Sequence, residues 1–362
     1  MSVFEHPEFD HHESIHFFDE PSTGLKAIIA ISSTALGPAA GGCRRWRYLS
    51  DADALTDVLR LSRGMTYKNA VAGLPFGGGK AVILADDASP KSPQLLRAFG
   101  RAVDSLGGRY ITAEDVGITV DDIRIVRQET TYVTGLPQSG EDAGGDPSPW
   151  TAMGVFLGLK AAAKARLGSD SLDGVKVAVQ GVGNVGFHLC KLLADAGASL
   201  VVADINRENL NRVANIVPVT EVAPNEILFA DVDILAPCAL GNILSAQTIP
   251  QIKARVIAGA ANNQLSAEID GERLVERGIL YAPDYVINAG GVISCAREYL
   301  ARSLEDQVRI EVSRIPERLT KIFADAERLN RPTNKIADDL ARRIVANASN
   351  GTPATPDTRR IA

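Results

Sequence analysis

Short apolar runs and one long helical stripe mark the first 115 residues. Residues 26–31 are apolar and β-branched, which predicts a buried strand, and a glycine-rich turn follows at residues 36–42. Ser50 has the residue type of an N-cap for a helix whose apolar stripe reaches Met65, so we expect Lys68 just beyond the helix end. The elements expected next are a bend, a strand, a helix and a strand, at residues 73–79, 80–84, 93–106 and 109–115.

Strands and helices alternate from residue 175 onward. A fully apolar strand at residues 175–180 meets a glycine turn that opens a helix to residue 196, and residues 199–203 form the next strand. Further strands are expected at residues 232–235, 255–258 and 278–282. Such alternation predicts a parallel sheet with helices on both faces, and the carboxyl ends of its strands form the ligand crevice.

The composition changes abruptly at residues 134–149, where Gly, Pro, Ser and Asp replace any hydrophobic period, and we place a hinge there. We therefore predict an α/β protein of two domains with a cleft between them. An α/β substrate-binding and oligomerisation domain occupies residues 1–140, and a Rossmann-type doubly wound domain occupies residues 141–330. Amphipathic helices close the chain; residues 331–362 should return toward the first domain and end in a disordered tail.

Composition and charge exclude several classes of protein. The 362 residues are 45% hydrophobic and 23% charged, and a net charge of -6 without any Lys/Arg-rich run argues against nucleic acid as a partner. No apolar run reaches membrane-spanning length and residues 1–18 do not resemble a signal peptide, so we expect a cytoplasmic protein without a membrane partner. The histidines of that start lie on an expected mobile terminus and predict no metal site. Four widely spaced cysteines indicate reduced thiols.

The strongest local motif is Gly181-x-Gly183-x-x-Gly186, which follows a strand and opens a helix. Gly181 permits the tight turn, Gly183 lets backbone N–H groups approach a pyrophosphate, and Gly186 lets helix and strand pack closely. Asp204, at the end of the next strand, would accept hydrogen bonds from ribose hydroxyls and repel a 2′-phosphate. The motif predicts that the second domain binds NAD rather than NADP.

Two lysines, Lys68 and Lys80, lie among apolar residues on either side of the glycine-rich bend. Burial and a second cation nearby both favour a neutral amine, and a neutral lysine can act as a base. Asp115 brings a carboxylate to the end of a strand in the same domain, whereas Glu114 should face the opposite side. Two surface lysines beside a flexible loop are the alternative, but the carboxylate and the dinucleotide domain favour a substrate site.

The run Gly77-Gly-Gly-Lys80 invites comparison with a phosphate-binding loop. The pattern GxxxxGK[ST] requires glycine where Leu74 stands and a hydroxyl where Ala81 stands. We therefore do not expect ATP hydrolysis or kinase activity.

Taken in order, the motifs between residues 25 and 296 resemble the amino-acid dehydrogenases that act on glutamate, leucine, valine and phenylalanine, and look most like the leucine-acting members. The motifs are Leu36-Gly-Pro-Ala-Ala-Gly-Gly42, Arg63-Gly-Met-Thr-Tyr-Lys68, Gly77-Gly-Gly-Lys80, Glu114-Asp-Val-Gly117, the Gly181 turn, Ala236-Pro-Cys-Ala239, Gly259-Ala-Ala-Asn-Asn263 and Pro283-Asp-Tyr-Val-Ile-Asn-Ala-Gly-Gly291. The resemblance implies a homo-oligomer that converts an L-amino acid, NAD⁺ and water to a 2-oxo acid, ammonium and NADH.

The resemblance also implies roles for single residues. Lys68, with the backbone of Gly41 and Gly42, would hold the substrate carboxylate; Lys80 would deprotonate the attacking water and Asp115 would relay protons. Asn262 and Asn288 would orient nicotinamide and substrate. The cofactor positions that it implies are Gly181, Gly183, Asn184, Val185, Gly186, Asp204, Cys238, Ala239, Asn262 and Thr151.

Substrate choice depends on the side-chain pocket. Glutamate dehydrogenases carry a lysine at the position of Ala40, and a distal carboxylate left unpaired in an apolar pocket is costly, so glutamate is disfavoured. The pocket positions that the resemblance implies are Ala40, Ala113, Thr134, Val292 and Cys295, all small or apolar. They favour leucine, valine or isoleucine. The leucine-acting enzymes tend to have leucine at the position of Ala40, so the larger pocket leaves phenylalanine or tryptophan open, and the residues after Cys295 also depart from the family pattern.

Two alternatives from outside this reaction stay open. A non-catalytic NAD-binding sensor could keep the fold, although it has no need of Lys68, Lys80 and Asp115 together. A different two-domain oxidoreductase, such as a folate dehydrogenase, would be active with its own substrate alone.

Overall fold

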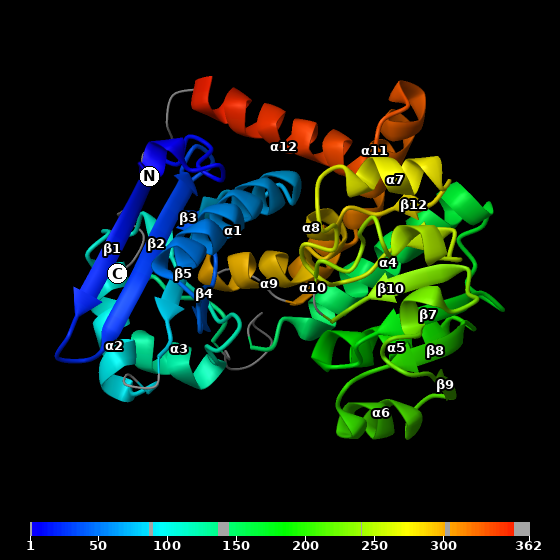
Figure 1. The fold of residues 1–362 in the computed structure, drawn as a ribbon, viewed down its shortest axis with the longest axis horizontal. Coiled ribbons are helices and arrows are strands. Elements are labelled where there is room, and N and C mark those ends of the chain that lie inside the picture. Colours follow the sequence, from blue (N-terminus) through cyan, green and yellow to red (C-terminus); the bar gives the residue numbers. More distant parts are fainter. Residues whose placement is uncertain (1, 87–89, 137–144, 240, 301–304, 351–362) are drawn as a thin grey trace. The chain divides into compact units, whose positions relative to one another are not determined.

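The computed structural model describes residues 2–86, 90–136, 145–239, 241–300 and 305–350, coloured along the sequence in Figure 1. The chain divides into two compact units. The first comprises Met1–Gly145, Cys295–Arg302 and Ala341–Ala362, and the second comprises Asp146–Ser294 and Ser303–Leu340. Helices α9 (Gly290–Tyr299) and α12 (Thr333–Asn350) each begin in the second unit and end in the first.

The first unit is built on a mixed sheet in the order β1-β2-β5-β3-β6, with β4 also paired to β5. Its strands are β1 (Ser14–Glu20), β2 (Leu25–Ser33), β3 (Ala39–Ala40), β4 (Cys43–Trp46), β5 (Gly77–Leu84) and β6 (Tyr110–Ile111). Strands β1, β2 and β5 pair antiparallel, whereas β3 and β4 run parallel to β5. Because side chains alternate between faces, Ile29 and Ile83 form one core and Ile28 and Val82 form another.

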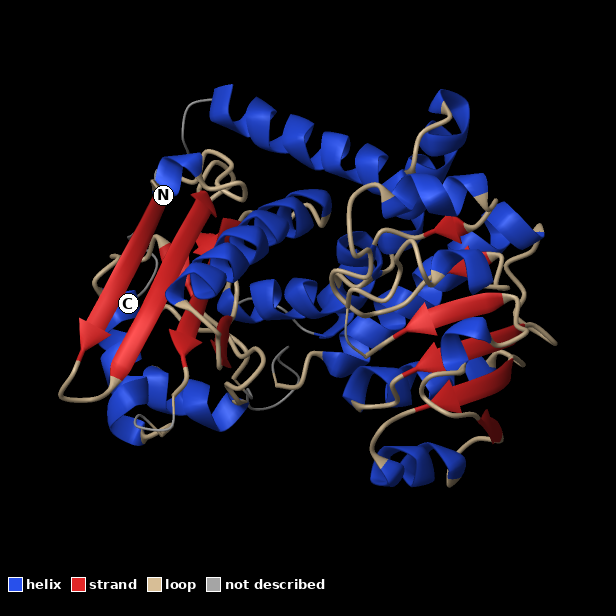
Figure 2. Cartoon of the chain, in the orientation of Figure 1, coloured by secondary structure: helices blue, strands red, loops and turns tan. Residues whose placement is uncertain are grey.

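Helices cover both faces of this sheet. They are η1 (Val3–Glu5), α1 (Asp51–Val71), α2 (Pro93–Asp104) and α3 (Val120–Val126). Helix α1 packs on β2 and β5, and Figure 2 shows it beside the red strands. Close packing here requires glycine, because a Cβ on Gly78 would lie 2.0 Å from the backbone nitrogen of Thr66.

Several local expectations for this unit were wrong. Lys68 lies in the last turn of α1, and β5 begins at Gly77, since its glycines extend the strand beneath α1. The strand expected at residues 109–115 is only Tyr110–Ile111. The start of the chain was expected to be mobile, yet residues 14–20 form β1 along the whole of β2. Strand β1 lies at the edge of the sheet and is half exposed, so it contains charged residues and shows no clear hydrophobic pattern.

The second unit holds a parallel sheet in the order β12-β11-β10-β7-β8-β9. Its strands are β7 (Lys176–Gln180), β8 (Ser199–Ala203), β9 (Val219–Glu221), β10 (Ile234–Pro237), β11 (Val256–Ile257) and β12 (Leu280–Tyr281). This is the doubly wound order with its switch point between β7 and β10, the neighbouring strands whose connections leave in opposite directions. The Rossmann-type fold expected from the sequence is confirmed.

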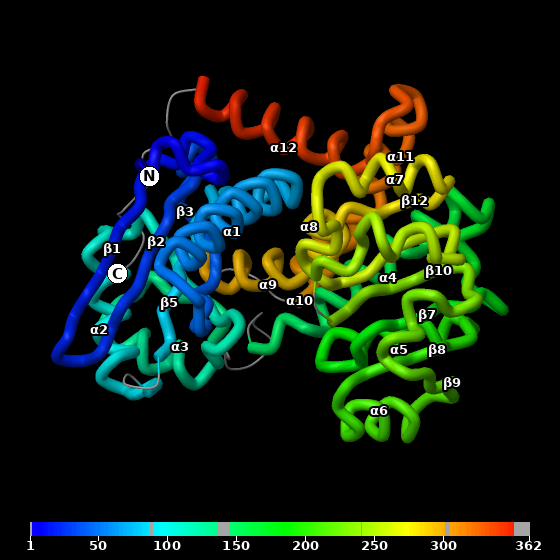
Figure 3. Tube along the Cα trace, viewed as in Figure 1, coloured from blue at the N-terminus to red at the C-terminus, as the bar shows by residue number. Residues whose placement is uncertain are grey.

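Helices flank the second sheet as Figure 3 traces them. They are α4 (Ser148–Leu167), α5 (Asn184–Asp195), α6 (Arg207–Ala214), η2 (Ile227–Phe229), η3 (Ile249–Gln251), α7 (Asp270–Glu276), α8 (Asp284–Ile287), α10 (Glu305–Val312) and α11 (Ile315–Leu329). One face of the sheet forms a core with η2, η3 and α7. Helix α4 packs against α5 and α11, and Gly158 lets Ile287 and Leu319 approach it.

Two features of the sequence fall partly outside the described residues. Much of the hinge region, residues 137–144, and nearly all of the expected disordered tail, residues 351–362, are not described. Among the helices of the described residues, none combines the length and apolar character needed to cross a membrane.

Candidate functional site

A buried ion pair lies at the centre of the first unit. Lys80 is in the middle of β5, where its side chain is 7% exposed, and its Nζ lies 2.7 Å from Oδ2 of Asp115. Asp115 follows β6 by a few residues and is held by a bridge to Ile118. The charged group in contact with this lysine is therefore a carboxylate, which can exchange a proton with it.

The charge state of Asp115 follows from opposing effects. Burial raises the pKa of the carboxyl, but the positive charges of Lys80 and Arg44 outweigh burial and lower this pKa to about 2. Arg44, on β4, places its Nε 3.4 Å from Asp115 Oδ2. The carboxyl is thus ionised at neutral pH, in the form that accepts protons and hydrogen bonds.

Lys68 and the paired glycines share the same region of the first unit. The last turn of α1 carries Lys68. A Cβ on Gly41 would lie 2.0 Å from Gly79 O, and one on Gly42 would lie 2.4 Å from Glu114 O, so neither position has room for a side chain. The hydroxyl of Tyr110 donates to Gly41 O at 2.6 Å and fixes this backbone.

The expected pocket residues are divided between the two units. Within the first unit, Thr134 Oγ1 donates to the carbonyl of Cys295 at 2.8 Å, so these two residues are brought together. Ala40 pairs with Gly78 along β5, and Ala113 O accepts from the nitrogen that begins β4. The fifth residue, Val292, lies on the part of α9 that belongs to the second unit.

A carboxylate that the sequence analysis did not single out fixes the segment around Thr134. Glu298, near the end of α9, accepts from the backbone N–H of Gly135 and of Leu136, each at 2.9 Å and each with its own oxygen. Burial raises the pKa of the Cys295 thiol to about 12, with Glu298 and Glu114 adding to the effect. That thiol is therefore neutral, and it acts as a small apolar surface.

In the second unit, the glycine turn joins β7 to α5. Gly181 adopts φ 84°, and a Cβ there would lie 2.7 Å from Ala239 Cβ. A Cβ on Gly186 would lie 2.1 Å from Gly181 O, whereas no atom of the described residues lies within 4 Å of one on Gly183. Asn184 and Val185 open α5, whose N-cap makes no side-chain hydrogen bond. An open, uncapped helix start suits a pyrophosphate, so these residues fit a dinucleotide.

Asp204 is tied to the same turn. Its Oδ2 accepts from Val182 N at 2.8 Å and its Oδ1 accepts from Asn206 N at 2.7 Å. Cys238 N donates to Gln180 O at 2.7 Å, which holds the loop after β10 against the turn. Asp204, Cys238 and Ala239 thus lie against the glycine turn, and Thr151 lies in the first turn of α4 in the same unit.

Two asparagines expected to orient the nicotinamide are in contact. Asn288 Nδ2 donates to Asn262 Oδ1 at 2.8 Å and to Ala260 O at 2.9 Å. Gln264, fully buried, donates to Gly259 O at 3.0 Å and to Ala261 O at 2.9 Å. The loop after β11 is therefore held by neutral amides, and Asn288 Oδ1 stays a buried acceptor without a hydrogen bond in the described residues.

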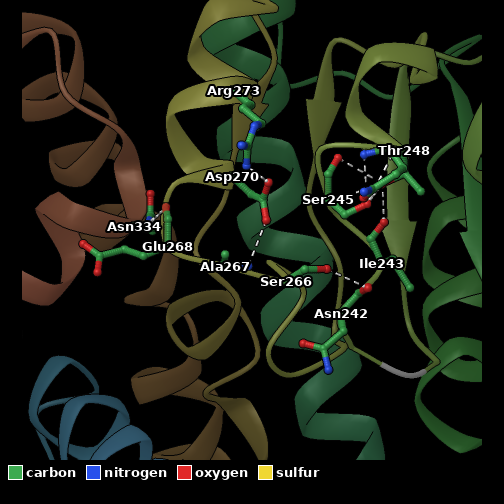
Figure 4. A network of polar contacts seen from close by, with 11 residues as sticks. Asn242, Ile243, Ser245, Thr248, Ser266, Ala267, Glu268, Asp270, Arg273 and Asn334 are labelled. Carbon is green, nitrogen blue, oxygen red and sulfur yellow. Dashed lines mark hydrogen bonds and ion pairs between the residues drawn. The ribbon is translucent and has the colours of Figure 1, made fainter. Parts of the chain in front are cut away.

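Further polar contacts hold the neighbouring loops in place (Figure 4). Ser266 Oγ donates to Asn242 O at 2.9 Å, and Asn242 N donates to Asn263 O at 2.7 Å, so the loops after β10 and β11 are joined. Asp270, 1% exposed, accepts from Ala267 N at 2.8 Å and begins α7. These hydrogen bonds tie the described parts of the two strand-end loops to each other and to the start of α7.

Comparison with known proteins decides the family. The model "Glu/Leu/Phe/Val dehydrogenase, dimerisation domain" matches residues 12–132, and the model "Glutamate/Leucine/Phenylalanine/Valine dehydrogenase" matches residues 146–207 and 200–350. The chain belongs to the Glu/Leu/Phe/Val dehydrogenase family. It is 53% identical to leucine dehydrogenase of Geobacillus stearothermophilus over 94% of this chain and 92% of that protein. The family resemblance inferred from the motifs is confirmed, and the protein is an amino-acid dehydrogenase that uses a nicotinamide dinucleotide.

Another member of the family is similar in sequence and in structure. L-Tryptophan dehydrogenase of Nostoc punctiforme is 48% identical over 96% of this chain and 97% of that protein. Its crystal structure superposes with a TM-score of 0.80, covering 93% of this chain and 97% of that one. The family thus includes similar relatives with aliphatic and with aromatic substrates in their names.

Sequence reasoning missed the residues that hold the site in place. The sequence analysis did not identify Arg44, Glu298 or Gln264 as site residues. A motif shows glycines and charged residues near one another in sequence, but these side chains act on segments far away along the chain. The one signal available was the position of Arg44, two residues after Gly42.

Proposed function

We propose that the protein catalyses the reversible NAD-dependent oxidative deamination of a branched-chain L-amino acid, leucine, valine or isoleucine, to the 2-oxo acid and ammonium. The observation that carries the proposal is the buried ion pair of Lys80 and Asp115 in a chain about half identical to a leucine dehydrogenase over nearly its whole length. A sensor that only bound NAD would have no use for a buried lysine paired with an ionised carboxylate.

The first unit supplies the charged groups in this proposal. Lys68 binds the substrate carboxylate, and the narrow backbone at Gly41 and Gly42 lets the amino acid approach. A bound NAD⁺ would supply the acceptor for the hydride that leaves the substrate Cα. Lys80 then takes a proton from the water that adds to the resulting imine, and Asp115 carries protons to and from the nitrogen until ammonium leaves.

The second unit supplies binding and orientation. Asp204 would accept from ribose hydroxyls while its charge repels a 2′-phosphate, so we propose NAD as the cofactor. One of its oxygens already accepts from Val182 N in the turn and the other from Asn206 N, so the carboxylate is held in place for that contact. Asn288 offers a buried acceptor for an amide or ammonium donor, and Asn262 is its direct partner.

An aromatic L-amino acid is the second candidate substrate. Ala40 leaves more space than the leucine that is usual in leucine-acting enzymes, and the L-tryptophan dehydrogenase of Nostoc punctiforme is a similar relative. A pocket of small residues can accept a branched-chain or an aromatic side chain, so the measured rates with each substrate must distinguish the two candidates.

Initial rates of NADH formation with leucine, isoleucine, valine, phenylalanine, tryptophan and glutamate test the proposal. We expect the highest kcat/KM with a branched-chain substrate, little rate with glutamate, and at least tenfold lower kcat/KM for NADP⁺. An aromatic preference would favour the second candidate. If no amino acid gave NADH formation while NADH still bound, a sensor or an oxidoreductase with another substrate would be favoured.

We also propose that the enzyme works as a cytoplasmic homo-oligomer. Its first unit matches a family model described as a dimerisation domain, and Trp46 at the end of β4 is 54% exposed, a large apolar side chain suited to a subunit contact. Light scattering tests the oligomer.

A further inference from the structure

Arg44 lies between two carboxylates in the first unit. Its Nη1 donates to Asp57 Oδ2 at 3.0 Å, and its Nε lies 3.4 Å from Asp115 Oδ2. Tyr48 donates its hydroxyl to the same Asp57 oxygen at 2.7 Å. The guanidinium therefore connects the carboxylate beside Lys80 to an anchor on α1.

The contact between Arg44 and Asp115 is an ion pair without a formed hydrogen bond. Arg44 Nε is buried, and among the described residues it has no hydrogen-bond acceptor. A buried N–H without an acceptor is unusual and calls for an explanation. This donor faces a carboxylate that must move protons, so a small rotation of Asp115 would complete the bond.

We propose that Arg44 is a positioning residue for Asp115, held in place by Asp57, and that it orients this carboxylate against Lys80 and favours its ionised form between proton transfers. The inference rests on the proposed function, in which Asp115 carries protons. The guanidinium is suited to the task because its planar fork reaches both carboxylates while its charge is permanent.

Few of the groups around Asp115 carry a charge that can act on its carboxylate. Lys80 faces it from β5, Cys43 and Arg44 from β4, and Tyr110 from β6. Burial raises the pKa of the Cys43 thiol and of the Tyr110 hydroxyl well above their usual values, so both are neutral. Removing the Arg44 charge must therefore raise the pKa of the Asp115 carboxyl, because this charge is one of the two that lower it.

The test is the pH profile of kcat/KM for the preferred amino acid in a set of variants. Arg44→Gln should move the acid limb of the profile upward by about one pH unit and lower kcat about tenfold. Arg44→Lys, which keeps the charge but loses the fork, should return the limb toward that of the wild type. Arg101→Gln, which removes an exposed arginine paired with Glu20, is the matched control and should change neither quantity.

Asp57→Asn separates charge from anchoring. It keeps the guanidinium and removes a negative charge, so kcat should fall while the acid limb stays in place or moves down. An unchanged pH profile in Arg44→Gln, or an upward shift of the acid limb in Asp57→Asn, would overturn the proposal. If Arg44→Gln does not fold, the Asp57→Asn profile serves as the test.

Failure of the proposed function would look different. If the wild type turned over no L-amino acid, the proposed function would be wrong. The role of Arg44 could still be tested by following the titration of the Asp115 carboxyl with carbon-13 NMR. Its pKa should rise in Arg44→Gln, and an unshifted titration would overturn the positioning role.

Discussion

The two units place their functional groups in opposite ways. In the first unit, the groups are charged side chains that neutralise one another around the buried Lys80: Asp115, Arg44 and Asp57, all partly buried. In the second unit, the described groups are backbone, neutral amides and the Asp204 carboxylate, arranged around the glycine turn and Gln264. A reaction that moves protons needs groups whose charge can change, whereas binding a dinucleotide needs space and fixed donors.

This difference predicts where substitutions act. A change of charge beside Lys80 and Asp115 should alter the rate and its pH dependence while the cofactor still binds. A change of backbone shape in the second unit should alter cofactor binding first. The predictions below test this division, beginning with the largest expected effect.

Lys80→Ala should lower kcat about a thousandfold, because loss of a positioned general base costs roughly two to four powers of ten. NADH should bind with unchanged affinity, measured by its fluorescence, since Lys80 belongs to the other unit. Lys26→Ala removes an exposed lysine from β2 and is the control. Activity near that of the wild type would remove Lys80 from the mechanism.

Two glycines of the same turn should respond differently to alanine. At Gly186 a Cβ would lie 2.1 Å from a backbone oxygen, so Gly186→Ala should destabilise the second unit by about 2 kcal/mol or more and weaken NAD binding. At Gly183 the space is open and φ is -62°, so Gly183→Ala should fold normally and lose roughly tenfold in NAD affinity.

Thermal melting and titration with NAD⁺ measure the two effects separately. If Gly183→Ala bound NAD⁺ as the wild type does, the dinucleotide would not lie against this turn.

The sequence predicted the second unit better than the first. Its strands are short apolar runs. The glycine turn is formed by consecutive residues, so its function could be predicted from the sequence of Gly181 to Gly186 alone. In the first unit the half-exposed β1 has no such pattern, and the strand before Asp115 proved shorter than expected. Periodicity identifies elements well only where burial is uniform.

The candidate site shows the same contrast. Lys80 and Asp115 were selected for their residue types and apolar neighbours, and they lie in contact. Arg44 could not be chosen in this way, because its role depends on Asp57 and Asp115, which different elements bring to it. Contacts that are distant in sequence come from topology, which one sequence does not specify residue by residue.

Glu298→Gln should have a moderate effect that is confined to the substrate side. The amide cannot accept from both Gly135 N and Leu136 N, so one hydrogen bond is lost and stability should fall by about 1–2 kcal/mol. The wall at Thr134 becomes looser, and we expect the preference for leucine over phenylalanine in kcat/KM to narrow several-fold. NAD affinity should not change; if it changed more than the substrate ratio, the division between the units would be wrong.

The smallest expected effect concerns stability against acid in the first unit, away from the reaction. His12 is buried, its Nδ1 accepts from Asp10 N at 3.2 Å, and its Nε2 lies 3.0 Å from Leu59 O on α1. Burial lowers the pKa of His12 below its ordinary value of 6.5. As the pH falls below 6.5, His12 binds a proton in the unfolded chain but not yet in the folded chain. Protonation therefore favours the unfolded chain, and the stability present above this pH is lost as the pH falls.

His12→Gln should therefore flatten the decline in unfolding free energy on the acid side, measured by urea denaturation and by hydrogen exchange of α1. His11→Asn, at an exposed position with φ 51° that asparagine tolerates, should leave the decline unchanged. If His12→Gln declined as steeply as the wild type, acid would act through other groups. A flatter decline without a change in kcat would show that a buried titratable group in the first unit can serve stability alone.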